Sequence, residues 1–356
     1  MSIQVIKQNV GVDISKDDFK VCFFQLKQDQ QSRIKASRTF KNTLAGFKEF
    51  AKWMDKHRAA DIVLCITVEA TGVYYEPLVH FLHDEQHYHI SVVLPNKSKA
   101  FAKSLNVKTK TDKVDAQILG QMGLERNLEP WAPMCTSLFA IKQLTRERVS
   151  LLDEKVALMN KLHARQHAYA PSKDVIKRLQ QRLKLLEKQL QQVEQLIQQA
   201  IKEDPALKER IDKVCQVRGL GWVTVATIVA ETNGFELFSS QSQLTSFAGY
   251  DIVERQSGSS IKGKTRISKK GNHFIRRALY CPALTAVRYE PQFKQLYERV
   301  TLRTAIKMKG LVAVQRKLLL LIYTLFKKNE NYDPNFANKQ KQFLGSRQET
   351  SPAYAG

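Results

Sequence analysis

Four acidic residues in the first third of this 356-residue chain lie where the surrounding pattern is apolar or begins a helix. Asp13 interrupts one apolar, strand-like run, and Glu69 directly follows another. Asp112 and Asp115 are three residues apart at the expected start of a helix, which places both carboxylates on one helical face. Carboxylates at strand ends and at a helix start can converge on one point, and their mutual repulsion then calls for cations. Mg²⁺ prefers such oxygen ligands, and two ions about 4 Å apart can promote phosphodiester chemistry.

Each acid also has a structural interpretation. Asp112 can cap a helix and Asp115 can be a favourable charge in its first turn, while Glu69 can be a surface charge at the end of a strand. Asp13 is harder to explain in this way, because an acid inside a central strand needs a partner. Three lysines beside the helical pair offer neutralising charge without a metal: Lys108, Lys110 and Lys113.

The composition indicates a polyanionic partner. The chain has 57 Lys and Arg against 34 Asp and Glu, a formal net charge of +23. Basic side chains that neutralise phosphates release counterions, so this excess favours nucleic acid, with an anionic membrane surface as the competing interpretation. The sequence has no uncharged apolar stretch of about 18 residues to span a membrane, and its first residues lack the apolar core of a signal peptide. Five scattered cysteines form no CxxC pair, so we expect neither a zinc site nor a disulfide framework.

The elements that must position the acids read as a mixed α/β domain in residues 9–126. Short apolar or β-rich runs alternate with segments of helical spacing, which is typical of α/β architecture. Because the first two strands are close in sequence, we expect part of the sheet to be antiparallel. The expected strands are 9–15, 19–26, 61–68 and 90–94, and the expected helices are 43–57, 73–83 and 112–124.

Residues 137–203 contain few glycines or prolines and predict long helices. Ser172 is a suitable N-cap for the second of these. Apolar residues then recur at alternating spacings of three and four: Ile176, Leu179, Leu183, Leu186, Leu190, Val193, Ile197 and Ala200. This heptad seam predicts that helix packs on helix. It does not distinguish a hairpin within one chain from a coiled coil between two chains.

Residues 204–330 are expected to be mainly helical with a loop-rich middle. A turn before an apolar helix resembles a helix-hairpin-helix, in which Gly219 and Gly221 let backbone N–H groups approach a DNA phosphate. Between residues 255 and 328 the only acids are Glu290 and Glu298, among many basic residues. The polar residues 336–356 are expected to form a disordered tail. The expected nucleic-acid contacts in the basic block are Lys262, Lys264, Arg266, Lys269, Lys270, Arg276 and Arg277.

Three short motifs together resemble a known enzyme family: VGVDIS at 10–15, VEATG at 68–72 and KTDKVDA at 110–116. They are similar to the DEDD motifs of the RuvC-like (RNase H-type) domain in DEDD transposases, the recombinases of bridge-RNA-guided insertion sequences. The resemblance covers roughly residues 9–330, with the order of the motifs intact. Four later motifs are similar to the second, transposase-specific domain of that family: FAGY at 247–250, QSGSS at 256–260, ISKKGN at 267–272 and IRRAL at 275–279.

The resemblance implies an acidic, Mg²⁺-binding tetrad made of Asp13, Glu69, Asp112 and Asp115. It also implies that Ser257 attacks a DNA phosphodiester and forms a covalent phosphoserine link, after which strands are exchanged and rejoined. A serine hydroxyl needs a base or a metal to help it lose its proton, and a metal–carboxylate site can supply that help. From the residues alone, the SGSS segment is a polar loop in which three serines compete.

The same resemblance implies donor and target DNA as substrates, a bridge RNA that pairs with both, and a homo-oligomer, dimer or tetramer, in which the serine of one chain can meet the acids of another. We therefore expect a cytoplasmic, nucleoid-associated protein with no membrane partner. The expected organisation is an α/β RuvC-like domain at 1–130, a helical coiled-coil linker or oligomerisation segment at 131–204, and a mainly α transposase domain with the catalytic serine at 205–335.

Other functions are also compatible with the residues. A RuvC-type metal-dependent junction nuclease would use the four carboxylates and water, so Ser257→Ala would keep cleavage and no protein–DNA adduct would form. A DNA-bridging architectural protein, dimerised through the heptads, would bind DNA without breaking it and would be indifferent to Asp13→Asn. A site-specific invertase is a close relative of the transposase function.

Overall fold

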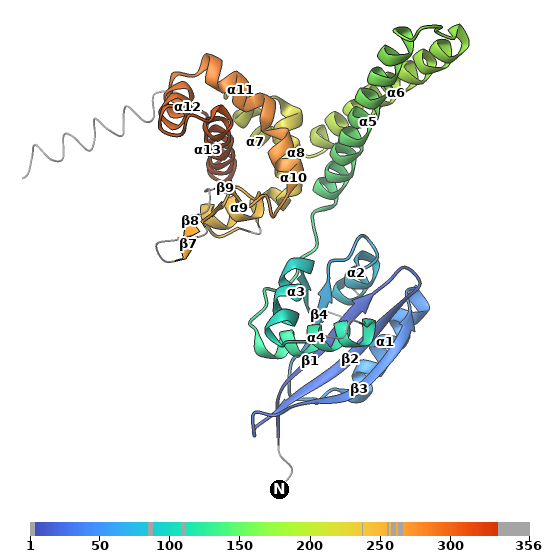
Figure 1. The fold of residues 1–356 in the computed structure, drawn as a ribbon. Helices are drawn as coiled ribbons and strands as arrows, with labels where there is room; N and C mark the ends of the chain where they lie inside the picture. Colours follow the sequence, from blue (N-terminus) through green and yellow to red (C-terminus); the bar gives the residue numbers. More distant parts are fainter. Residues whose placement is uncertain are drawn as a thin grey trace, which may run out of the picture. The chain divides into compact units, whose positions relative to one another are not determined.

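The computed structural model describes residues 4–84, 88–107, 111–236, 238–254, 256–257, 261–262 and 266–333, with only the backbone at 256–257 and 261–262. The chain divides into two compact units, Met1–Pro133 and Met134–Gly356, and each has its own hydrophobic core. The first unit is a sheet flanked by helices and the second is mostly helical (Figure 1). The expected α/β domain followed by a mainly helical region is therefore confirmed.

The first unit is built on a five-stranded sheet with the strand order β3-β2-β1-β4-β5. β1 is antiparallel to β2, and β2 is antiparallel to β3, whereas β1, β4 and β5 are parallel. This order and these directions are those of the RNase H-like fold, and the expected antiparallel start of the sheet is confirmed. The strands are β1 (Val5–Ile14), β2 (Asp18–Lys27), β3 (Ser32–Lys41), β4 (Leu64–Glu69) and β5 (His89–Val93).

The edge strand β3 was not predicted. Its sequence, SRIKASRTFK, lacks a run of alternating apolar residues, and only Phe40 of the strand is buried. Hydrogen bonds to β2 hold it in the sheet instead. Exposed basic side chains on an edge strand also discourage pairing with other sheets. The polar sequence that prevented the prediction of this strand is therefore suited to the edge of a sheet.

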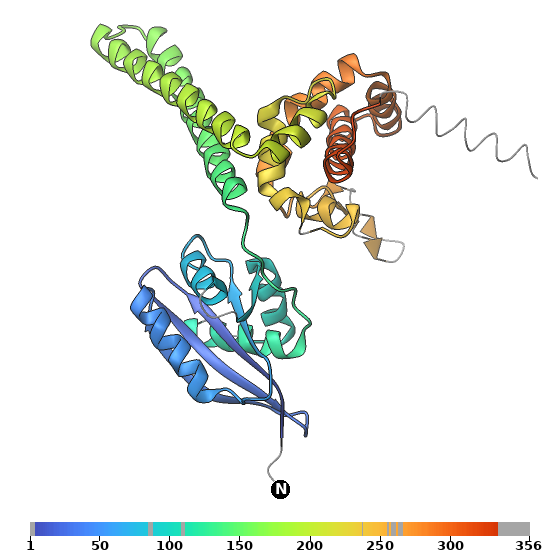
Figure 2. The same ribbon diagram turned by 180° about the vertical axis from the view of Figure 1, so that it is seen from behind.

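Helices cover both faces of the sheet (Figures 1 and 2). On one face, Phe47 and Phe50 of the first helix pack with Val10 and Val12 of β1 in the main core of the unit. On the other face, the last helix of the unit packs against β1 and β2. The helices are α1 (Leu44–His57), α2 (Glu76–Asp84), α3 (Pro95–Ser104) and α4 (Asp112–Glu125).

Two long helices, α5 (Thr136–Gln166) and α6 (Lys173–Lys202), form a hairpin in the second unit (Figure 2). Ser172 caps α6 as predicted, because its hydroxyl accepts a hydrogen bond from the backbone of Val175. All eight seam residues of α6 are buried or half-buried, and two ion pairs join α6 to α5. The heptad seam thus packs within one chain. Contact with a second chain stays a prediction.

Four other helices of the second unit, α7, α9, α11 and α12, contact α13, while α8 contacts α5 and α10. A short ribbon of paired strands, β6 with β9 and β7 with β8, lies between α9 and α10 in the sequence. Within the described residues, no helix is long and apolar enough to cross a membrane. The elements are α7 (Pro205–Cys215), α8 (Trp222–Glu231), the 3₁₀ turn Asn233–Phe235, α9 (Gln241–Phe247), β6 (Ile252–Val253), β7 (Gln256–Ser257), β8 (Ile261–Lys262), β9 (Arg266–Ile267), α10 (His273–Ala278), α11 (Tyr280–Tyr289), α12 (Pro291–Thr304) and α13 (Lys307–Lys328).

Candidate active site and nucleic-acid interface

Asp13 is placed by the alternation of side chains along β1. Asn9, Gly11 and Asp13 are two residues apart, so they point to the same face of the sheet, the face that α4 covers. Gly11 marks the closest approach of α4, because a Cβ added there would overlap the backbone of Ala116 and Gly120. The glycine two residues before Asp13 therefore allows the helix to lie directly on the strand.

The direction of α4 brings its first turn to the strand end that carries Asp13. A Cβ on Gly123 would meet the side chain of Asn9, nearer the start of β1. The helix therefore runs antiparallel to β1, and its N-terminal turn lies beyond Gly11. Asp112 and Asp115 are in that turn.

Glu69 reaches the same end of the sheet from β4. β4 pairs with β1 in parallel, so its last residue lies beside Asp13. The Glu69 carboxylate accepts hydrogen bonds from the hydroxyl of Thr71, at 3.0 Å, and from the hydroxyl of Ser98 in α3. These contacts hold the carboxylate in place, and sequence reasoning did not identify either hydroxyl.

The four predicted carboxylates come together around Asp13. Burial, followed by the negative charges of Asp115, Asp112 and Glu69, raises the pKa of Asp13 from 3.8 to about 7. A shift in this direction means that burial and neighbouring negative charge together outweigh the favourable charge of Lys20 on ionised Asp13. The tertiary structure therefore assembles the acidic cluster that the sequence predicted.

Lys20 brings positive charge to this acidic cluster. Lys20 of β2 is directly opposite Asp13 in the antiparallel pair, so the two side chains share a face. The Lys20 ammonium donates to Asp112, and this contact lowers the pKa of Asp112 and raises the pKa of Lys20. Sequence reasoning missed Lys20, although the three residues between β1 and β2 make its position opposite Asp13 predictable. Of the lysines considered instead, Lys108 and Lys110 lie outside the described residues.

Two structural interpretations of the acids do not agree with the geometry. The N-cap of α4 is Thr111, whose hydroxyl accepts a hydrogen bond from the backbone N–H of Val114, rather than Asp112. Glu69 is half-buried and hydrogen-bonded, so it is not simply a surface charge at a strand end. Both carboxylates therefore lack a purely local explanation.

The donor set of the cluster fits a hard divalent cation. Asp112, Asp115 and Glu69 lie near enough to Asp13 that their negative charges, after burial, raise its pKa. Among the residues that the structure describes, no group of three or more His, Cys, Asp or Glu side chains is arranged to hold a metal ion. Lys20 pairs with Asp112 instead, so a cation that uses Asp112 would have to displace Lys20.

Without divalent ions, we expect Asp13→Asn to have a larger free energy of unfolding than the wild type at about pH 8. Asp13 binds its proton more tightly in the folded chain, so its favourable contribution is present below its unfolded pKa and is lost as the pH rises toward about 7. Because the residue is only partly buried, we discount the full shift to about 1–2 kcal/mol. Chemical denaturation in a chelator, at about pH 4 and about pH 8, measures the free energy of unfolding of both proteins. If the difference between variant and wild type were the same at both pH values, the raised pKa of Asp13 would be contradicted.

The second unit contains the predicted serine. The backbone of Ser257 in β7 pairs with that of Ile261 in β8, inside the segment closed by the pairing of β6 with β9. The side chains of Ser257 and Lys262, and all of Lys264, lie outside the described residues. The role of Ser257 therefore stays a prediction.

The remaining predicted basic contacts fall into two groups. The arginines of α10 make internal contacts: Arg276 donates to the backbone carbonyl of Ala248 at 2.7 Å, and Arg277 forms two hydrogen bonds with Asp153 of α5 at 2.6 and 2.5 Å. These arginines help to hold the unit together, and their contact with nucleic acid stays a prediction. Three others are exposed, as phosphate contacts require: Arg266, Lys269 and Lys270.

The glycine turn before α8 is partly explained by its backbone. Gly219 has φ +95°, a left-handed conformation that favours glycine. Gly221 is the N-cap of α8, and an added Cβ would meet no atom within 4 Å. The turn therefore requires Gly219, whereas Gly221 leaves open space at a helix N-terminus, and phosphate binding there stays a prediction.

Comparison with known proteins identifies the family. Residues 10–171 match a DEDD transposase model of the IS110 type, and residues 212–298 match the model described as transposase IS116/IS110/IS902 family. A pilin gene-inverting protein of Moraxella bovis is 30% identical over 329 residues, which cover 92% of this chain and 98% of that protein. This chain belongs to the IS116/IS110/IS902 family of transposases.

Two more distant similarities accompany these matches. The transposase for insertion sequence element IS1111A of Coxiella burnetii is 22% identical over 359 residues, covering 91% of this chain and 90% of that protein. A solved structure of T. thermophilus RuvC in complex with a Holliday junction substrate has a TM-score of 0.27 and 10% identity, covering 35% of this chain and 99% of that chain.

Members of the IS116/IS110/IS902 family are transposases, so this chain is a DNA-cleaving and rejoining enzyme with DNA as its substrate. Nucleases of the DEDD type depend on divalent metal ions, in agreement with the donor set of the acidic cluster. The first matched range contains all four carboxylates, and the second contains Ser257.

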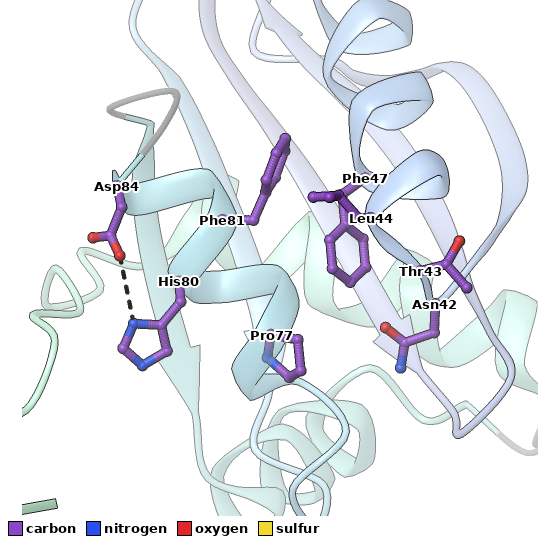
Figure 3. A pocket seen from close by; sticks show the side chains of 8 residues that line it. All are labelled: Asn42, Thr43, Leu44, Phe47, Pro77, His80, Phe81 and Asp84. Carbon is purple, nitrogen blue, oxygen red and sulfur yellow. Dashed lines mark ion pairs between the residues drawn. The ribbon is translucent and has the colours of Figure 1, made fainter.

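A shallow hollow of about 450 Å³ lies between α1 and α2 of the transposase (Figure 3). Asp84 at its rim pairs with His80 and His83. Asn42 also lines the hollow, and its side-chain amide donates to the backbone carbonyls of Ser15, at 3.0 Å, and Tyr74, at 3.1 Å. These bonds join the segments that follow β1 and β4. None of the four predicted carboxylates lines the hollow, so it is not the candidate active site.

Proposed function

We propose that this transposase excises and inserts a DNA element through a covalent phosphoserine–DNA intermediate. The observation that carries the proposal is the convergence of Glu69, Asp112 and Asp115 on Asp13, whose pKa is raised to about 7 by burial and by these charges. Such a concentration of carboxylates destabilises a fold and suits divalent cations, Mg²⁺ in our proposal. The four acids are the residues that would hold the metal.

The proposed chemistry divides the work between the acids and Ser257. A bound Mg²⁺ would neutralise charge on the scissile phosphate and assist loss of the hydroxyl proton. The Oγ atom of Ser257 forms a bond to phosphorus, the bond from phosphorus to the leaving sugar oxygen breaks, and the serine proton ends on that oxygen. In the reverse step a hydroxyl of the new strand displaces Ser257. The intermediate keeps the phosphoester bond, so rejoining requires no ATP.

The proposal includes RNA and a second copy of the chain. A bridge RNA that pairs with donor and target DNA would choose the sequence, while the protein contacts backbone and shape, a division of labour known from RNA-guided nucleases. The net charge of +23 and the exposed Arg266, Lys269 and Lys270 support contact with polyanions. A homo-oligomer joined by the α5–α6 hairpins would let Ser257 of one copy meet the acids of another, in the cytoplasm at the nucleoid.

Replacing Ser257 with Ala is expected to abolish the covalent adduct. The protein is purified from cells that carry its flanking non-coding DNA, bound RNA is sequenced, and cognate DNA and Mg²⁺ are added. On a denaturing gel, wild-type protein should migrate with DNA, and Ser257→Ala should show a loss of about 10³-fold or more, because the nucleophile is absent. Ser259→Ala and Ser260→Ala are the matched controls and should keep the adduct.

The other outcomes discriminate between functions. If Ser257→Ala cuts DNA without forming an adduct, the result would favour the metal-dependent junction nuclease. Tight, salt-sensitive binding with no strand breakage by any variant would promote the architectural protein.

Site-specific inversion is a second candidate function. It is favoured by the Moraxella bovis relative, which is a pilin gene-inverting protein and aligns over 98% of its length. A plasmid that carries the recombination sites in inverted or direct orientation separates the two candidates. Inversion of the intervening segment supports the invertase, whereas release of a circle supports excision.

A further inference from the structure

A fully buried carboxylate lies at the end of α8, outside the acidic cluster. The side chain of Glu231 is 0% exposed. The guanidinium group of Arg146 donates to its two oxygens, at 2.6 and 2.9 Å, and the amide of Asn272 donates to one of them at 2.6 Å. A buried charge is tolerated only with such partners, so all three side chains are held in one arrangement.

The partners of Glu231 come from different parts of the second unit. Arg146 belongs to α5 of the hairpin, and its guanidinium group also lies over the ring of Phe274 in α10, 4.7 Å from the ring centre. Asn272 is the N-cap of α10, where its side-chain oxygen accepts hydrogen bonds from the backbone of Phe274 and Ile275. Glu231 therefore joins the hairpin, α8 and the start of α10.

Asn272 also makes a contact near the base of the ribbon that contains Ser257, where Asp251 and Ser268 meet. Its backbone N–H donates to the carbonyl of Phe247 at 2.7 Å. Four residues earlier, the backbone N–H of Ser268 donates to the backbone carbonyl of Asp251 at 2.8 Å. The Ser268 hydroxyl donates to the Asp251 carboxylate at 2.5 Å. The segment from Asp251 to Ser268 is thus closed by bonds at its two ends, and one end continues directly into Asn272.

The contacts of Glu231 with Arg146 and Asn272 form a first clamp between α10 and the hairpin, and a second clamp joins the same two elements. Arg277 of α10 pairs with Asp153 of α5, two helical turns along α5 from Arg146. α10 is therefore attached to the hairpin at two points, and rotation of the ribbon base relative to α5 is opposed by both. Only the first of these clamps has a buried charge at its centre.

We propose that Glu231 is a positioning residue, which fixes the direction in which the ribbon presents Ser257 relative to the α5–α6 hairpin. The inference rests on the proposed function, because only a reacting Ser257 gives the orientation a catalytic meaning. Sequence reasoning did not identify Glu231, since it is a single acid at the end of an apolar helix. The acids that it identified all belong to the first unit.

The test compares Glu231→Gln, Arg146→Met and Asn272→Ser with wild type in the full chain. The serine at 272 retains a good helix cap but is too short to reach Glu231 in the same way. Arg148→Met is the matched control, because Arg148 is also on α5 but pairs with Glu194 of α6, at 2.7 Å, instead of with Glu231. Circular dichroism and thermal unfolding verify that each variant is folded.

Two measurements test whether Glu231 holds the ribbon: hydrogen exchange at its base and the rate of adduct formation. Hydrogen exchange should speed up by about tenfold or more at the backbone amides of Ser268, Lys269 and Asn272 in the three variants and should be unchanged in Arg148→Met. At saturating DNA, the rate of adduct formation should fall by about 10²-fold, because a small displacement of a reacting group has effects of that size. The DNA concentration that gives half the maximal rate should stay within about twofold.

The outcomes separate this inference from the proposed function. Unchanged exchange in a folded Glu231→Gln or Asn272→Ser protein overturns the positioning role, whatever the activity. Faster exchange without any loss of adduct formation also overturns it, because the clamp would then be structural only. If Ser257→Ala forms the same adduct as wild type, the proposed nucleophile is wrong, while the exchange data still decide whether Glu231 holds the ribbon.

Discussion

Asp13→Asn is expected to reduce DNA strand cleavage by about 10³-fold or more, while the affinity for DNA changes little. The asparagine keeps the size of the side chain but removes a negative charge from the centre of the acidic cluster. A metal at such a site contributes several kcal/mol to the stabilisation of the transition state, and about 4 kcal/mol corresponds to about 10³ in rate. Single-turnover cleavage of cognate DNA in Mg²⁺ measures the rate, and a filter-binding assay measures affinity.

The same substitution should act in opposite directions on activity and on stability. Without metal, Asp13→Asn removes a charge that is disfavoured by burial and by repulsion, the two causes that raise the pKa of Asp13 to about 7. The free energy of unfolding should therefore increase. Glu49→Gln is the matched control, because Glu49 is an exposed acid of the same unit that pairs only loosely with Arg38, at 3.6 Å. A variant at Asp13 that cleaves DNA at the wild-type rate would remove the acidic cluster from the mechanism.

Gly11→Ala is expected to destabilise the first unit by about 3 kcal/mol, a large effect for one methyl group. The added Cβ would overlap backbone atoms of Ala116 and Gly120, and backbone atoms cannot rotate away as a side chain can. The helix would have to move off β1, and Asp112 and Asp115 would move with it. Cleavage should therefore fall by about 10²-fold even at a temperature where the variant is folded. Denaturant unfolding and single-turnover cleavage measure the two effects.

Gly120→Ala provides the comparison for Gly11→Ala. Its added Cβ would overlap the ring of Phe24, a side chain, and would meet the backbone oxygen of Cys22 only at 3.3 Å. Because the overlap is with a side chain and not with backbone, we expect a smaller loss of stability. Ser37→Ala, on the exposed edge strand β3, should have almost no effect. If Gly120→Ala proved as damaging as Gly11→Ala, the close approach of α4 at Gly11 would not be the feature that holds the acidic cluster together.

Local sequence patterns predicted the elements that carry the acids. The apolar runs around Asp13 and before Glu69 are strands β1 and β4, and the helical spacing after Asp112 is α4. The heptad seam is a helix, and Ser172 caps it. These features depend on residues close in the chain, where periodicity and capping act directly. The polar edge strand β3 escaped detection because its partner β2, and not its own pattern, holds it in the sheet.

The amino-acid sequence by itself therefore determined which elements form and which carboxylates they carry, because those properties follow from local spacing. Only the tertiary structure decided what those side chains meet. Lys20 reaches Asp112 across 92 positions of the chain, and Arg146 reaches Glu231 across 85. Such pairs depend on strand register and on how closely helices pack, as at Gly11, and these are set by the whole core rather than by neighbouring residues. Charge pairing at long range is thus a result of folding that no local pattern encodes.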